Sequence, residues 1–131
     1  MKTNEGIEME SQNAELPSMA FFDEETLLWR MGGDREDTKA LLDAFSMESK
    51  AFIEEIRQDI ERCDAFALRT HSENLHECAS AVSSATIKYF AHRMQHSAER
   101  DDFDSAKRLF PLLAASLSLL DEKLREGGWL N

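Results

Sequence analysis

A stretch near the middle of the chain carries polar side chains at a spacing that could support chemistry. The residues Glu73, His76, Glu77 and Ser80 follow one another at intervals that place them on one face of a helix. An imidazole is nucleophilic and neutral near pH 7, whereas a glutamate is a weak, anionic nucleophile. The stretch therefore offers one candidate nucleophile, His76, among acidic neighbours.

The other potential ligands do not predict a metal or cofactor site. His92 and His96 stand four residues apart, but no carboxylate or cysteine completes a set around them. His71 lies on the flank of an apolar helix face, where a packed, hydrogen-bonded histidine is expected. Cys63 and Cys78 are too few for a disulfide scaffold or zinc knuckle, and Cys78 is expected to be a small buried residue. We expect no metal and no cofactor, since a glycine-rich phosphate loop is also absent.

Composition excludes several classes of function. The chain has 131 residues, of which 42% are hydrophobic, and this indicates one globular domain. The formal net charge of −11 disfavours nucleic-acid binding and favours a partner with a basic or mixed surface. There is no apolar run of the ~20 residues that span a bilayer and no signal-peptide pattern at the start, so we expect a cytoplasmic protein without membrane contact.

The pattern of apolar residues predicts helices throughout, after a polar, acidic tail over residues 1–18 that we expect to be disordered. A short helix begins after Asp23 and ends at Gly32-Gly33. Four long amphipathic helices follow, and we place them at 34–62, 64–82, 84 to about 100, and 102–126. Aspartates 34, 64 and 102 are the predicted N-caps, Ser83-Ser84 breaks and recaps the chain, and Pro111 should bend the last helix.

Short polar turns between long helices imply antiparallel neighbours. The sequence therefore predicts an all-α protein: an antiparallel, up-down-up-down four-helix bundle over residues 19–131, with a short extra N-terminal helix.

From Phe22 to about Leu124 the chain resembles the histidine-containing phosphotransfer (HPt) domain family. The opening stretch 22–34, which ends in Gly-Gly-Asp, is similar to the family's short first helix and turn. The residues Phe45 and 52–56 fit its long second helix, and 103–106 fits the start of its last.

The resemblance weakens at the family's chemical signature, His-x-Leu-Lys-Gly-Ser. Matching Leu75 to the signature Leu and Cys78 to the Ser puts Glu73 in the place of the phosphoryl-accepting His. The same register puts His76 in the place of the Lys and Glu77 in the place of the Gly. In the family, the imidazole attacks an aspartyl phosphate on a receiver domain and the Lys offsets phosphate charge. A mainly negative face would repel phosphoryl oxygens instead.

The resemblance therefore implies a pseudo-HPt protein without a catalytic residue of its own. It would bind a response-regulator receiver domain or a histidine kinase without relaying phosphate. The expected partner-binding residues are Glu73, His76, Glu77, Ser80, Arg69 and Phe66. Phe66 either packs against the preceding turn or belongs to an exposed docking patch, and Glu73 either mimics a phosphate or is an ordinary exposed residue.

Two other functions stay open. His76 could be a relocated phosphoryl acceptor, although starting the signature there gives His-Glu-Cys-Ala-Ser and loses the Lys and Gly as well. Alternatively, the chain could be a structural or assembly protein that shares only the bundle architecture with the HPt family, because fold does not fix function.

Overall fold

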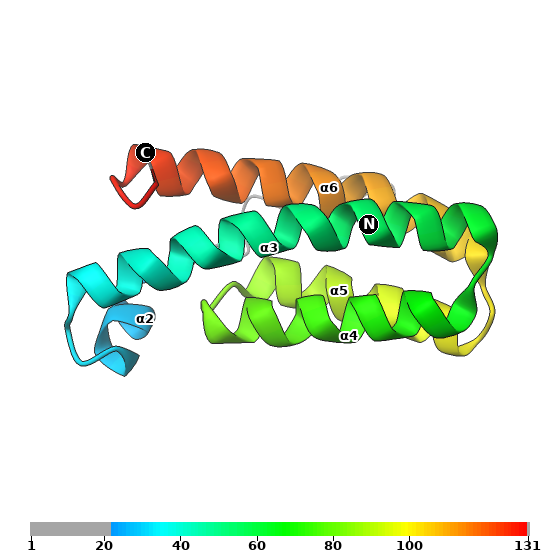
Figure 1. Cartoon of the computed structure of the whole chain (residues 1–131), viewed down its shortest axis with the longest axis horizontal. Helices are drawn as coiled ribbons and strands as arrows, with labels where there is room; N and C mark the ends of the chain where they lie inside the picture. The colour runs from blue at the N-terminus through cyan, green and yellow to red at the C-terminus, as the bar shows by residue number, and fades with distance from the viewer. Residues whose placement is uncertain (1–21, 131) are drawn as a thin grey trace, which may run out of the picture.

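The computed structural model of the chain describes residues 22–130, and this part is built from α-helices without any strand. The helices are α2 (Glu24–Arg30), α3 (Arg35–Arg62), α4 (Ala65–Ala81), α5 (Ala85–Glu99) and α6 (Phe103–Glu126). The four long helices form an antiparallel bundle in which α3 and α6 lie along α4 and α5, with the short α2 at one end (Figure 1). The predicted all-α fold is confirmed. The predicted tail, residues 1–18, lies outside the described residues, and the domain boundary at residue 19 stays a prediction.

Each long helix begins where a polar side chain caps it. The four predicted aspartate caps are confirmed, because Asp23, Asp34, Asp64 and Asp102 accept hydrogen bonds from the backbone amides three residues later, at 2.9–3.1 Å. Ser84 does the same for α5, with its Oγ 3.4 Å from the amide of Ile87. A cap of this kind stabilises a helix by about 1 kcal/mol, so the helix boundaries are set locally by the sequence.

The turns between helices are tight and use left-handed backbone. Gly32 and Gly33 have φ values of 71° and 79°, which glycine adopts without steric cost. Ser83, between α4 and α5, has φ 59° although it carries a side chain. This short turn places α5 directly against α4, which are the two helices with the most extensive mutual packing.

The core lies between the four long helices and is almost entirely aliphatic. Its members include Leu42, Ile56, Leu68, Leu75, Ile87, Met94, Leu113, Leu120 and Leu124, each fully buried. Burying one such side chain stabilises the fold by about 1.5–3 kcal/mol. Leu68, Leu75 and Ala79 belong to α4, so the inward face of that helix is fixed by packing.

The overhanging end of the bundle is closed by α2 and by the segment after α6. Trp129 is 1% exposed; its indole Nε1 donates to Glu24 at 3.1 Å, and its carbonyl accepts from Lys39 at 2.8 Å. Phe22 packs edge-on against the indole ring, and the Arg35 guanidinium lies 4.1 Å from the ring centroid. Trp129 and Leu130 are therefore part of the core, and Trp129 ties the two ends of the described chain together.

The proline in α6 does not end the helix. α6 continues as a helix through Pro111, and the expected bend there stays a prediction. Within residues 22–130, no helix combines the length and apolar character that crossing a membrane requires.

Candidate functional site

The polar face of α4 points away from the core, as the sequence predicted. Glu73 and Glu77 are exposed, while His76 and Ser80 are half-buried. Leu75 and Ala79 on the opposite side are completely buried. Residue 73 is therefore an outward-facing carboxylate near the middle of the helix.

The neighbouring helix α5 contributes a matching row of polar side chains. The Nε2 of Gln95 lies 3.4 Å from Glu73 Oε2, and the rings of His76 and His92 have centroids 5.7 Å apart. Lys88 and Ser80 line one cleft. Residues 73, 76 and 80 of α4 therefore lie opposite residues 95, 92 and 88 of α5, with the same spacing along the two antiparallel helices. These six residues form what we call the α4–α5 seam.

His76 has the most perturbed environment in this seam. Its pKa lies below the ordinary value for histidine, because partial burial disfavours the imidazolium and the charges of Lys88 and His92 add to the effect. Glu77 acts in the opposite direction. His76 is consequently held in its neutral, nucleophilic form at neutral pH.

Within residues 22–130, the carboxylate of Glu73 forms no ion pair with a cationic side chain. Its one side-chain hydrogen bond within the described part of the chain comes from Gln95, whose amide also contacts Glu99 Oε2 at 3.3 Å. A single long contact between exposed groups holds a side chain weakly. The carboxylate is thus free to be covered or re-paired by a partner.

An aromatic side chain extends this surface toward the start of α4. Phe66 is 73% exposed, which argues against packing on the preceding turn, and its place in a docking patch stays a prediction. The guanidinium of Arg69 stands 6.0 Å from the centroid of its ring. Aromatic residues and arginine are each enriched at protein interfaces.

The other histidines and cysteines have the following surroundings. His71 is half-buried and its Nδ1 lies 2.6 Å from Asp59 Oδ2, which confirms the predicted structural histidine. Cys78 is half-buried rather than buried, because it lies at the α3 boundary with its Sγ 3.8 Å from Glu48; burial raises the pKa of its thiol. The His92 and His96 rings are 4.7 Å apart. Among residues 22–130 no three donors are grouped to hold a metal ion.

Sequence reasoning along α4 alone missed the residues that α5 and α2 supply. Gln95 and His92 face the seam from α5, and Lys88 and Arg30 add positive charge at its end. The expectation of a mainly negative face is therefore incomplete. A signal was available, because a three-residue turn at 82–84 forces residues equally distant from it to face each other across two antiparallel helices.

Comparisons with known proteins agree with the fold. No family model matches the sequence, and a search of curated proteins finds no match. Among solved structures, the chain is similar to histidine-containing phosphotransfer protein B from Pseudomonas aeruginosa PAO1, with a TM-score of 0.76 and 17% sequence identity. The match covers 82% of this chain and 93% of the other. The described bundle therefore has the fold of a histidine-containing phosphotransfer protein.

Proposed function

We propose that this chain is a non-catalytic, HPt-like interaction module of two-component phosphorelay signalling in the cytoplasm. It binds a response-regulator receiver domain or a histidine kinase and does not accept phosphate at position 73. The observation that carries the proposal is the exposed carboxylate of Glu73 at the middle of the α4 face in a bundle with this fold.

The chemistry of Glu73 supports the absence of transfer. A receiver's phosphoryl group carries negative oxygens, and a carboxylate at the point of attack repels them. The side-chain donor that contacts Glu73 is the neutral amide of Gln95, which offers no charge to offset this repulsion. The exposed Glu77 one turn further along α4 adds a second negative charge.

The surroundings of Glu73 support a docking role. Exposed Phe66 and half-buried Arg69 lie along the same face of α4 as Glu73, at spacings of three and four residues. Aromatic and arginine side chains are the residues that most often dominate binding energy at interfaces. Together with His76, Glu77 and Ser80, they form the proposed docking surface.

A second candidate function has one specific observation in its favour. The lowered pKa of His76, caused first by burial and then by Lys88, gives a neutral imidazole with a lysine nearby. This combination suits a phosphoryl acceptor that is displaced by one turn from position 73. An active phosphotransfer protein that uses His76 is therefore the alternative.

The docking proposal is tested by binding. Purified receiver and kinase domains from the same cell are titrated against the full chain, and at least one is expected to bind. Phe66→Ala should weaken that binding about tenfold, as for a typical interface anchor. Leu112→Ala, which truncates a 42% exposed side chain on α6, is the matched control and should bind as the parent does. If no domain binds, a structural or assembly role is favoured instead.

A further inference from the structure

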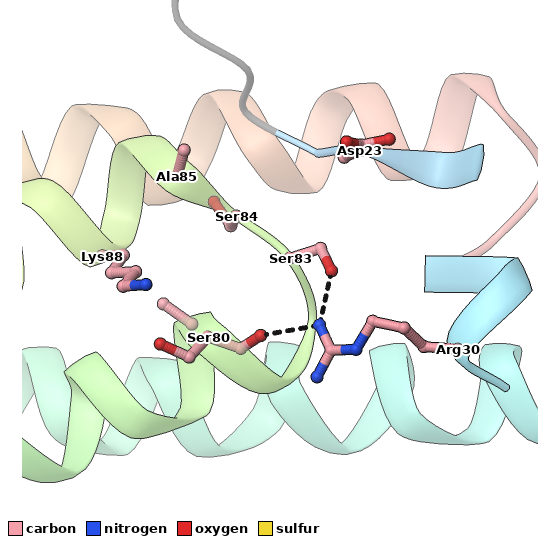
Figure 2. A pocket seen from close by; sticks show the side chains of 8 residues that line it. Asp23, Arg30, Ser80, Ser83, Ser84, Ala85 and Lys88 are labelled. Atoms are coloured by element: carbon pink, nitrogen blue, oxygen red, sulfur yellow. Dashed lines mark hydrogen bonds between the residues drawn. The ribbon is translucent and has the colours of Figure 1, made fainter. Parts of the chain in front are cut away.

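A cleft of about 250 Å³ lies where the turn between α4 and α5 meets α2. Arg30 of α2, Ser80 of α4 and Lys88 of α5 point toward it from three sides (Figure 2). A water molecule takes about 30 Å³ of the liquid, so the cleft has room for several. Its size suits a small polar group rather than a large apolar ligand.

The cleft gathers positive charge that is not neutralised locally. The Nη1 of Arg30 donates to the Ser80 carbonyl at 3.2 Å and to Ser83 Oγ at 2.8 Å (Figure 2). Within residues 22–130, neither Arg30 nor Lys88 forms an ion pair with a carboxylate, and Lys88 makes no side-chain hydrogen bond there. Two such cations at one place stand out in a chain with 26 acidic and 15 basic residues.

The acidic side chain in the lining is already engaged. The oxygens of Asp23 accept from the amide and hydroxyl of Thr26, at 3.1 and 2.8 Å, as the N-cap of α2. The carboxylate opposes anion binding by its charge, but one carboxylate does not balance the two cations. The cleft is therefore net positive.

Neutral donors at the cleft add to this charge. The 15-residue helix α5 begins at Ala85, which lines the cleft, so the positive end of its dipole lies there. Within residues 22–130 the hydrogen bond of Ser80 to a side chain uses its carbonyl, so its hydroxyl can also donate to a ligand. A ligand with several acceptor oxygens and more than one negative charge would use all of these groups.

We infer that this cleft binds an oxyanion of the phosphate class, either free phosphate or a phosphate monoester. Lys88 and Arg30 would neutralise its charge, and the start of α5 would donate backbone hydrogen bonds. The inference goes beyond the proposed docking function, because the cleft needs no partner protein. It lies at the end of the α4–α5 seam, so an occupied cleft would place an anion at Ser80 and Lys88, one turn of α4 away from His76.

The test titrates the isotope-labelled full chain with inorganic phosphate, with total ionic strength held constant by chloride. We expect saturable shifts of the backbone amides at the start of α5. Lys88→Gln should raise the dissociation constant at least tenfold, because it removes a charge-assisted hydrogen bond. Lys88 has no partner in the described chain, so this variant should fold normally.

Lys107→Gln is the control, because it removes the same charge from an exposed position on α6; it should bind phosphate as the parent does. Titration with methyl phosphate under the same conditions shows whether an ester also enters. The inference is overturned if the shifts do not saturate, or if Lys88→Gln binds phosphate as tightly as the parent. No partner is present in the experiment, so either result leaves the docking proposal to its own test.

Discussion

Two histidines on α4, five residues apart, have opposite surroundings. His71 faces α3, with its Nδ1 2.6 Å from Asp59 and its Nε2 3.5 Å from Glu55. His76 faces α5, beside the ring of His92 and near the charge of Lys88. One side of the helix is closed by the contacts of His71 with two carboxylates of α3, whereas the other is held by weak contacts. We call the side of α4 that carries His71 the structural flank and the side that carries His76 the open flank.

The structural flank has a clear physical reason. Asp59 is 3% exposed and lies near the C-terminal end of α3, where the helix dipole disfavours a carboxylate. The imidazole of His71 supplies the hydrogen bond that this buried group needs. On the α4–α5 seam, Glu73 is exposed and water can replace its 3.4 Å contact with Gln95. A partner could therefore displace this contact at little cost in free energy.

The largest effect is expected for a variant that removes the contacts of the structural flank. His71→Ala should lower the free energy of unfolding by about 2–3 kcal/mol, because it leaves the Asp59 carboxylate buried without a partner. The value is below that of fully buried pairs, since the His71 side chain is 25% exposed. Urea denaturation measures it. His76→Ala on the open flank should change stability by less than about 0.5 kcal/mol; equal losses for the two variants would contradict the comparison.

An intermediate effect is expected for a variant that changes three residues of α4 on or beside the open flank. The triple variant Glu73→His, His76→Lys, Glu77→Gly restores the family signature at its three most specific positions and leaves Cys78 in the place of the Ser. It should gain phosphoryl acceptance from a phosphorylated receiver, at a cost in stability of about 1 kcal/mol from the helical glycine. Radiolabel transfer and thermal unfolding measure the two effects. If the triple variant folds and binds its partner but takes up no label, the result would count against the alignment that places Glu73 at the position of the phosphoryl-accepting His.

The smallest effect concerns protonation of the open flank. Because the pKa of His76 is lowered in the folded protein, the unfolded chain binds more protons around pH 6.5, so stability falls as the pH drops through that range. Burial is the largest cause of the lowering and Lys88 is the second, so Lys88→Gln should raise this pKa and reduce the loss of stability. NMR titration of the His76 ring measures it, with Lys107→Gln as control. An unchanged pKa in Lys88→Gln would show that Lys88 does not act on this ring.

Local signals in the sequence predicted the helices well, because each start is set by a nearby side chain. Asp23, Asp34, Asp64 and Asp102 cap the helices at the predicted positions. The helical spacing of apolar residues on α4 also predicted that Glu73 faces outward. These properties depend on residues within one or two turns, which a single sequence displays directly.

Contacts between distant segments were not predicted. Arg30 reaches Ser80 across fifty positions of the sequence, and Trp129 is buried against α2 and α3 although it follows the last helix. Neither contact leaves a local pattern. The positive charge near His76 was missed for the same reason, because Lys88 belongs to another helix.

We propose above all that this chain accepts no phosphoryl group from a receiver, because the outward position on α4 holds the carboxylate of Glu73. The most direct measurement incubates the full chain with a radiolabelled, phosphorylated receiver domain that binds it, and follows the label on both proteins over time. We predict that the label stays on the receiver or is released as phosphate, with none on this chain. Acid-labile label that appears on the parent protein and disappears in His76→Ala would contradict the claim and establish His76 as the acceptor.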